Sequence, residues 1–306
     1  MEAALSRESA GASSYALLRR VELRSRRRLD GLLQGERRGR RPGPGGEPSL
    51  TRDYQPGDDV RWVDWPLSAR TGQPTVRVPE LEPVLTAWAL IDCSPSMRFG
   101  SLRETKLDLG REVLAGIGTV LRRRGDRLGV VATSGGELDV VRPPRGDRRG
   151  LAAALAAVDA VPPAPATGRA DLPRAVRTLG RLARHRGAVL VISDFPESAE
   201  LERALGMLGR SHEVIAIDVR DRRERELPEI GTLTLRDVET SRTVTVDTND
   251  RGFRERLARV AAESAERRRS MLARAGARHV VVETGSDWLL ALARTLEGPG
   301  RRVAVS

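Results

Sequence analysis

Residues 84–97 read V-L-T-A-W-A-L-I-D-C-S-P-S-M, and this stretch decides the fold. Its first eight residues form a nearly continuous apolar run of strand length, which is typical of a strand buried on both faces. The segment G-A-V-L-V-I-S-D at 187–194 has the same character. Because these are the most continuously apolar segments of the chain, we expect strands at 84–91 and 187–193 that are adjacent, parallel and central in one sheet.

Outward from these two strands, apolar runs of strand length alternate with helical patterns. Further strands are predicted at 127–133, with a hairpin partner at about 137–142, and at 212–219 and 278–283. A small hairpin is predicted at 230–247, and helices at 103–124, 148–158, 171–185, 197–209, 250–275 and 286–297. This alternation predicts a Rossmann-like α/β fold, with a mostly parallel central sheet and helices on both faces.

Composition narrows the class of protein. The chain has 306 residues and a formal net charge of +11, and Lys106 is the only lysine among its 53 basic residues. This preference for arginine is typical of a GC-rich coding sequence, so the charge is weak evidence for a phosphate-backbone partner, and no dedicated nucleic-acid partner is expected. No apolar run is long enough to span a membrane, and the first 30 residues lack the apolar core of a signal peptide. A soluble cytoplasmic protein is therefore expected.

Polar residues follow both central strands, at the position where α/β sheets bind their ligands. Asp92, Ser94 and Ser96 offer three oxygen ligands in one tight loop, and Asp194 adds a second carboxylate at the same sheet edge. Hard oxygen ligands suit Mg²⁺, so the pattern predicts a magnesium site. The other interpretation is that Asp92 and the serines only hydrogen-bond the loop and cap the next helix.

Two motifs resemble known families. The D-x-S-x-S pattern at 92–96 resembles the metal-ion-dependent adhesion site of von Willebrand factor A domains. The stretch T-R-D-Y-Q-P-G-D-D-V-R-W-V-D-W at 51–65, which runs into S-A-R-T-G at 68–72, resembles the signature of the domain of unknown function 58 family. That family is a bacterial group of von Willebrand factor A-like proteins associated with MoxR-type AAA+ ATPases. The resemblance covers about residues 49 to 300.

The resemblance implies a set of metal ligands. Asp92, Ser94 and Ser96 match the first metal loop, and Asp194 matches the acidic residue of the later loop. The middle loop of the family usually has a threonine, but Ala170 stands at that position here, and Thr167 lies three residues early. The resemblance therefore implies a degenerate adhesion site, with weaker Mg²⁺ binding that Ala170→Thr should strengthen.

Three regions follow from these patterns. Residues 1–48 form a basic N-terminal helix with a Gly/Pro linker, 49–82 form the family signature module, and 83–306 form the von Willebrand factor A-like domain. The apolar positions of the basic helix can pack as one stripe on the main domain, or the helix can contact a membrane or partner.

The signature module is dense in charged and aromatic residues. We expect its arginines and aspartates to form charge-assisted bonds, with Trp62 and Trp65 packed between them, and so to clamp the N-terminal segment onto the domain. Asp64→Ala would then remove one partner of a buried ion pair, at a cost of about 3–5 kcal/mol. A direct role in partner binding is the alternative. The residues concerned are Arg52, Tyr54, Asp58, Asp59, Arg61, Asp64 and Trp65.

The sequence does not predict an enzyme. Cys93 has no histidine nearby, Ser94 and Ser96 lack the G-x-S-x-G elbow, and neither a Walker A motif nor a G-x-G-x-x-G loop occurs. We expect a protein-interaction module that works with a MoxR-type AAA+ ATPase in chaperone-like or complex-maturation roles, with a partner carboxylate completing the metal site. The alternative is a basic protein that binds nucleic acid or a membrane surface, and a weaker one is a metal-dependent hydrolase.

Overall fold

The computed structural model describes residues 14–22, 49–79, 84–101, 104–135, 137–162, 171–236, 243–289 and 291–292. These residues belong to two compact units. One unit comprises residues 14–22 and those from Leu85 onward, and the other lies within Arg27–Val84. The larger unit holds the central sheet, and the smaller one holds the signature motif.

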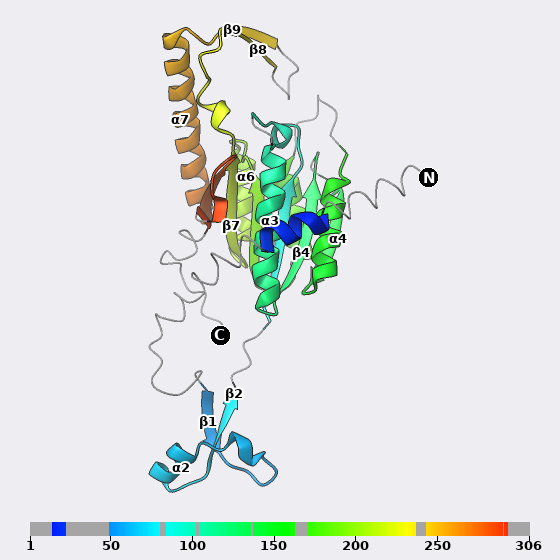
Figure 1. The fold of residues 1–306 in the computed structure, drawn as a ribbon, viewed down its shortest axis with the longest axis vertical. Coiled ribbons are helices and arrows are strands. Elements are labelled where there is room, and N and C mark those ends of the chain that lie inside the picture. The colour runs from blue at the N-terminus through cyan, green and yellow to red at the C-terminus, as the bar shows by residue number, and fades with distance from the viewer. Residues whose placement is uncertain are drawn as a thin grey trace, which may run out of the picture. The chain divides into compact units, whose positions relative to one another are not determined.

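A six-stranded sheet forms the centre of the larger unit (Figure 1). In spatial order its strands are β10 (Arg278–Glu283), β7 (Glu213–Arg220), β6 (Ala188–Ser193), β3 (Thr86–Asp92), β4 (Arg127–Thr133) and β5 (Val140–Arg145). All neighbouring strands are parallel except β5, which runs antiparallel to β4. The two strands predicted to be central, β3 and β6, are indeed the middle pair, with Ile91 opposite Ile192.

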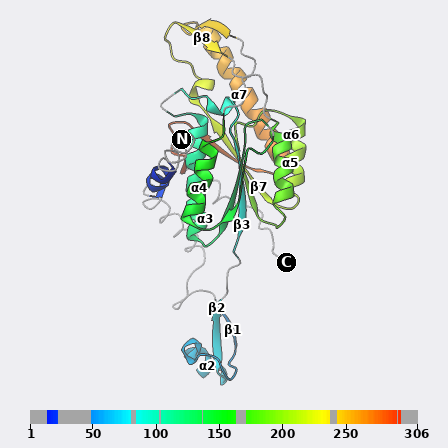
Figure 2. The same ribbon diagram turned by 90° about the vertical axis from the view of Figure 1, so that its right-hand side faces the viewer.

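Helices cover both faces of this sheet, which confirms the predicted α/β fold class. Figure 2 shows α3 and α4 on one face and α5 and α6 on the other. Both faces of the central strands are therefore apolar, and Leu90, Ile91, Val191 and Ile192 are fully buried. The helices are α3 (Lys106–Arg123), α4 (Arg148–Asp159), α5 (Leu172–Leu182), α6 (Ala199–Leu208) and α7 (Arg251–Arg274).

The hairpin partner of β4 begins three residues later than predicted. Asp139 accepts hydrogen bonds from the backbone N–H and the hydroxyl of Ser134, which hold these two residues together just before β5 begins at Val140. β5 contains Pro143 and Pro144, which an edge strand tolerates because its outer N–H groups need no partner. The predicted strand is therefore present, but it includes both prolines and ends at Arg145 rather than at 142.

Residues 14–22 are helical and lie on the larger unit. Leu17, Leu18 and Val21 are buried, so the predicted apolar stripe packs on the domain. Ser14 donates to Asp159 of α4 at 3.2 Å, and Arg122 of α3 donates to Glu22 at 3.1 Å. The segment thus binds across both helices of one face.

The long helix α7 follows the predicted small hairpin, which consists of β8 (Thr232–Arg236) and β9 (Thr243–Asp247). Of its 24 residues only Met271 and Leu272, in its last turn, are buried. Of the predicted helix at 286–297, residues 288–289 and 291–292 are helical, residues 286–287 precede the helix, and the other positions lie outside the described residues. Among the helices that the structure describes, none has both the length and the apolar character to cross a bilayer.

The small unit pairs β1 (Ser49–Asp53) with β2 (Thr75–Pro79) in an antiparallel hairpin. Between them lie the short helix η1 (Val60–Trp62) and the helix α2 (Trp65–Thr71). Asp59 caps η1 and Asp64 caps α2, each by accepting a backbone N–H with its side chain. The two aspartates therefore act as the N-cap residues of these helices.

Helix α3 contacts the C-terminal segment through a glycine, which leads to the first prediction. An ideal Cβ on Gly116 would lie 2.2 Å from Cη2 of Trp288, a side chain that is 2% exposed. Gly116→Ala should therefore destabilise the protein by about 1–3 kcal/mol through overpacking. Thermal or urea unfolding measures this change.

Gly206→Ala in α6 is the matched control. A Cβ there would come no closer than 4.0 Å to the carbonyl oxygen of Ala275. The added methyl group should leave stability unchanged or raise it by about 0.5–1 kcal/mol, because alanine favours helix over glycine. Equal effects of the two substitutions would contradict the packing of Trp288 against Gly116.

Candidate functional site

The polar loops after β3 and β6 meet at the carboxyl end of the sheet because the two strands are parallel neighbours. Asp92 closes β3 and Ser193 closes β6. The Ser193 hydroxyl donates to Oδ2 of Asp92 at 2.7 Å, across 101 residues of sequence. The structure thus brings the two predicted loops into direct contact.

Asp92 is a buried carboxyl group, 1% exposed. Its Oδ1 accepts the backbone N–H of Ser94 at 2.9 Å, and its Oδ2 accepts the Ser193 hydroxyl. Burial, and then the charge of Asp194, raise the pKa of Asp92 to about 6. The two carboxyl groups are therefore close enough to repel each other when both are ionised.

The loop after Asp92 is fixed by packing and by its serines. The hydroxyl oxygens of Ser94 and Ser96 lie 3.1 Å apart, and Met97 in the following turn is fully buried. Cys93 is also fully buried, and burial, together with the charge of Asp92, raises the pKa of its thiol to about 12. This thiol is inert as a nucleophile, because thiolate chemistry needs a low pKa and access.

Asp194 binds the ammonium group of Lys106, a residue that the sequence did not predict at this site. Nζ of Lys106, in the first turn of α3, donates to Oδ2 of Asp194 at 2.8 Å and also to Glu224. The Lys106 side chain is 2% exposed, whereas those of Asp194 and Glu224 are 18% and 39% exposed. Burial disfavours its charge, but the two carboxylates outweigh burial and raise the pKa of Lys106.

The chain turns sharply directly after Asp194. Phe195 has φ 49°, in the left-handed region, and its side chain is fully buried. Its backbone N–H donates to the Ser193 hydroxyl at 3.1 Å. A left-handed conformation costs a bulky residue about 1–2 kcal/mol. Burial of the ring therefore enforces the turn that directs Asp194 toward Lys106.

The described donors do not form a ready site for Mg²⁺. Asp194 already has an ammonium partner, and both oxygens of Asp92 accept protein donors. Within the described ranges, no three His, Cys, Asp or Glu side chains are grouped to hold a metal ion. Thr167 and Ala170 lie outside the described residues. Magnesium binding thus stays a prediction, and the pairing of Asp194 weighs against it.

The charged residues of the signature module form pairs within the small unit. Arg52 binds Asp58 with two hydrogen bonds of 2.7 and 2.6 Å, and Arg61 binds Asp59 through both Nε and Nη2. Asp58 also accepts the backbone N–H of Gln55. These bonds fix the turn between β1 and α2 and are largely exposed, so salt screens them.

The structure corrects the expectation for the tryptophans of this module and shows a capping role for Asp64. Trp62 and Trp65 are 53% and 66% exposed, so the prediction that they pack between the charged pairs is wrong. Asp64 caps α2 by accepting the N–H of Leu67 at 3.2 Å, a bond whose loss costs about 1 kcal/mol. The backbone N–H of Tyr54 donates to the carbonyl oxygen of Pro74 at 2.8 Å, which extends the pairing of β1 with β2 by one residue.

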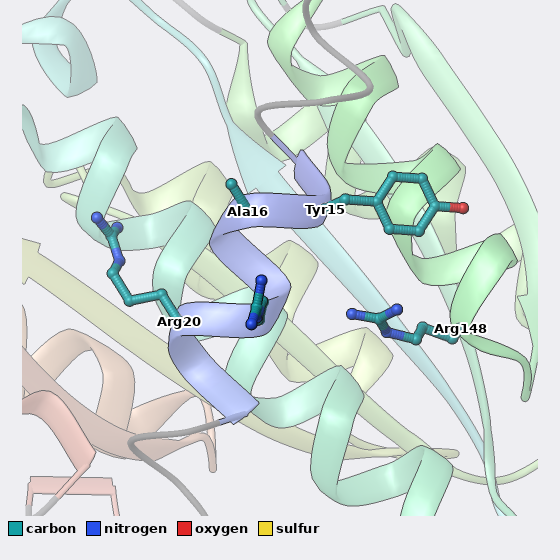
Figure 3. Close-up of a pocket in the computed structure, with 5 residues that line it drawn as sticks. Tyr15, Ala16, Arg20 and Arg148 are labelled. Carbon is teal, nitrogen blue, oxygen red and sulfur yellow. The ribbon is translucent and has the colours of Figure 1, made fainter.

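An open hollow of about 580 Å³ lies beside helix 14–22, lined by Tyr15, Ala16, Arg19, Arg20 and Arg148 (Figure 3). The Arg148 guanidinium lies over the Tyr15 ring, 5.6 Å from its centre. Arg20 pairs with Glu112, and Arg148 lies 3.4 Å from Glu22. Two of the three arginines thus already have acidic partners, so this hollow is a weaker candidate than the sheet edge.

Comparison with known proteins identifies relatives over most of the chain. A family model described as "Protein of unknown function DUF58" matches residues 50–267. Uncharacterized proteins of Mycobacterium tuberculosis and Mycobacterium bovis are each 38% identical over 279 residues, which cover 91% of this chain and 87% of each relative.

Solved structures also align with the chain. BatB from Bacteroides thetaiotaomicron aligns over 69% of this chain and 97% of its own, at 14% identity and a TM-score of 0.43. A von Willebrand factor type A protein from Catenulispora acidiphila aligns over 69% of this chain and 41% of its own, at 13% identity and a TM-score of 0.33.

The raised pKa of Asp92 leads to the second prediction. The folded protein holds the proton of Asp92 more tightly than the unfolded chain, so this group lowers stability as pH rises from about 4 to about 6 and above. Asp92→Asn keeps the shape without the charge. It should raise the unfolding free energy by up to about 3 kcal/mol at about pH 7.5, and by little at about pH 4.

Urea unfolding of both proteins in EDTA, at the two pH values, measures this difference. Asp139→Asn is the control, because Asp139 also accepts hydrogen bonds in a loop at this sheet edge, whereas the carboxylate that raises the pKa of Asp92 is Asp194. A loss of stability by Asp92→Asn at the higher pH would show that the ionised carboxylate is needed.

Proposed function

Because the chain belongs to the family described as protein of unknown function DUF58, we propose that it is a non-enzymatic protein-interaction module. In this proposal it is an adaptor for a MoxR-type AAA+ ATPase in complex maturation. The observation that carries the proposal is the sheet edge, where the loops after β3 and β6 are held together by the bond between Ser193 and Asp92. Ligands of open α/β sheets bind at this edge.

The reactive groups at this edge favour binding over catalysis. Asp92 is 1% exposed and Cys93 is fully buried, so neither can touch a substrate in this conformation. The groups that solvent reaches include Ser96, Asp194 and Glu224. The backbone N–H of Phe99 donates to the carbonyl oxygen of Ser96, and the Phe99 side chain is 37% exposed. An exposed ring with fixed polar neighbours is the arrangement of an interface anchor.

The small unit offers a second contact surface. Val60, Trp62 and Trp65 are each more than half exposed on it. Tryptophan is enriched among the residues that contribute most to interfaces, because it buries a large area with few rotatable bonds. The exposed tryptophans therefore support the partner-binding interpretation of the signature module.

Nucleic-acid binding has less support from the charges of the described residues. On α7, Arg251, Arg267, Arg269 and Arg274 each pair with a glutamate. Phosphate binding needs arginines that are free to replace counterions, and each of these pairs would have to break first.

The third prediction tests the adaptor proposal with a purified MoxR-type ATPase from the same genome. Phe99→Ser should weaken ATPase binding at least tenfold, and Trp62→Ala with Trp65→Ala should do the same, because truncation of an interface anchor costs about 2 kcal/mol or more. Biolayer interferometry gives the dissociation constants, and circular dichroism confirms that each variant folds.

Met207→Ser is the matched control, since Met207 is 53% exposed on α6, away from the carboxyl edge. It should change the affinity less than twofold. If the parent protein does not bind the ATPase, or if all variants bind as the parent does, the adaptor proposal fails. Binding to DNA that falls steeply with added salt would favour the nucleic-acid alternative instead.

A further inference from the structure

The single lysine of the chain occupies a buried position at the sheet edge. Lys106 follows Thr105, which caps α3 together with Asp108 in a reciprocal pair of bonds. This cap fixes the start of the helix, so the lysine stem points inward and its side chain is 2% exposed. Lysine is almost never this buried unless its charge is paired.

Its two partners come from distant parts of the chain. Asp194 lies directly after β6 and Glu224 lies in the short helix η3 (Arg222–Glu224) after β7. The ammonium group therefore connects α3 with the loops that follow two neighbouring strands. An ammonium is a compact charge with three donors, whereas a guanidinium is a wide planar fork, so the site suits lysine in a chain whose other basic residues are arginines.

The same carboxylate is the one expected to approach a metal ion. Asp194 matches the later loop of the adhesion site, and its Oδ2 lies 2.8 Å from Nζ of Lys106. A divalent ion shared by Asp92 and Asp194 would have to sit beside an ammonium of the same sign of charge. The Asp194 carboxylate can therefore bind either a divalent ion or the Lys106 ammonium, but not both.

We propose that the ammonium of Lys106 is the resident cation of this site and takes the place of the divalent metal. It neutralises Asp194 and holds the loops after β6 and β7 in position on α3. Contact with a partner at this edge then needs no metal ion bridging to a partner carboxylate. Only this statement about partner contact rests on the proposed function. The replacement of a metal ion by the Lys106 ammonium is a property of the isolated protein.

Melting curves in EDTA and in millimolar Mg²⁺ test the proposal on the full chain. The parent protein should melt at the same temperature in both buffers. Lys106→Met removes the charge while keeping the length of the side chain, so it should melt lower in EDTA and recover by about 3 °C or more with Mg²⁺. Isothermal titration should detect Mg²⁺ binding to Lys106→Met, and adding Asp92→Asn should abolish it.

Arg111→Met is the matched control on the same helix. Arg111 is 17% exposed and pairs with Asp108 and Asp159, so its loss also leaves carboxylates without this cation, but neither of them is a carboxylate that binds Lys106. It should gain no Mg²⁺ binding. The proposal is overturned if the parent itself binds Mg²⁺ and melts higher in it, a measurement that does not require any variant to fold. It is also overturned if a folded Lys106→Met melts like the parent and binds no Mg²⁺. No ATPase is present in this experiment, so its outcome is independent of the adaptor test.

Discussion

The parallel pairing of β3 with β6 is the constraint on which the candidate site depends. Both strands are apolar on both faces, so each can be buried only in the middle of a sheet that helices cover on both sides. Parallel neighbours end at the same edge, which brings Asp92 to the hydroxyl of Ser193 and places Asp194 beside them. The packing of apolar side chains therefore determines where these polar groups meet, although the polar groups add no apolar surface to the core.

The fold could be predicted from the sequence because its signals are local and repeated. Apolar runs such as 187–193 give strands, helical periodicity gives covering helices, and their alternation leaves few topologies. The turn before β5 and the hairpin of the small unit were harder to see. Pro143 and Pro144 obscure where the edge strand ends, and residues 49–53 and 75–79 are short segments that pair across η1 and α2.

The candidate site could be predicted in part. Asp92, Ser94, Ser96 and Asp194 stand where α/β sheets bind ligands, and the structure brings their loops together. The cation was not placed, because Lys106 lies 88 residues from Asp194 and 118 from Glu224, and no local pattern encodes such contacts. The rarity of lysine was the available signal. A single lysine in an arginine-rich chain indicates a position where an ammonium group fits and a guanidinium does not. The prediction that Trp62 and Trp65 are packed was wrong, because the spacing of residues in the sequence cannot distinguish an exposed aromatic side chain from a buried one.

Locally unfavourable features gather at this one edge of the sheet. Asp92 is a buried carboxyl group whose ionisation burial opposes, Lys106 is a buried ammonium, and Phe195 holds a left-handed backbone conformation. Each opposes folding on its own, and the packed helices and strands around them offset the cost. Sequences break local rules mainly where a site requires it. Stability alone would favour apolar residues in place of the Lys106–Asp194 pair, so the pair supports the proposal that this edge of the sheet binds a partner.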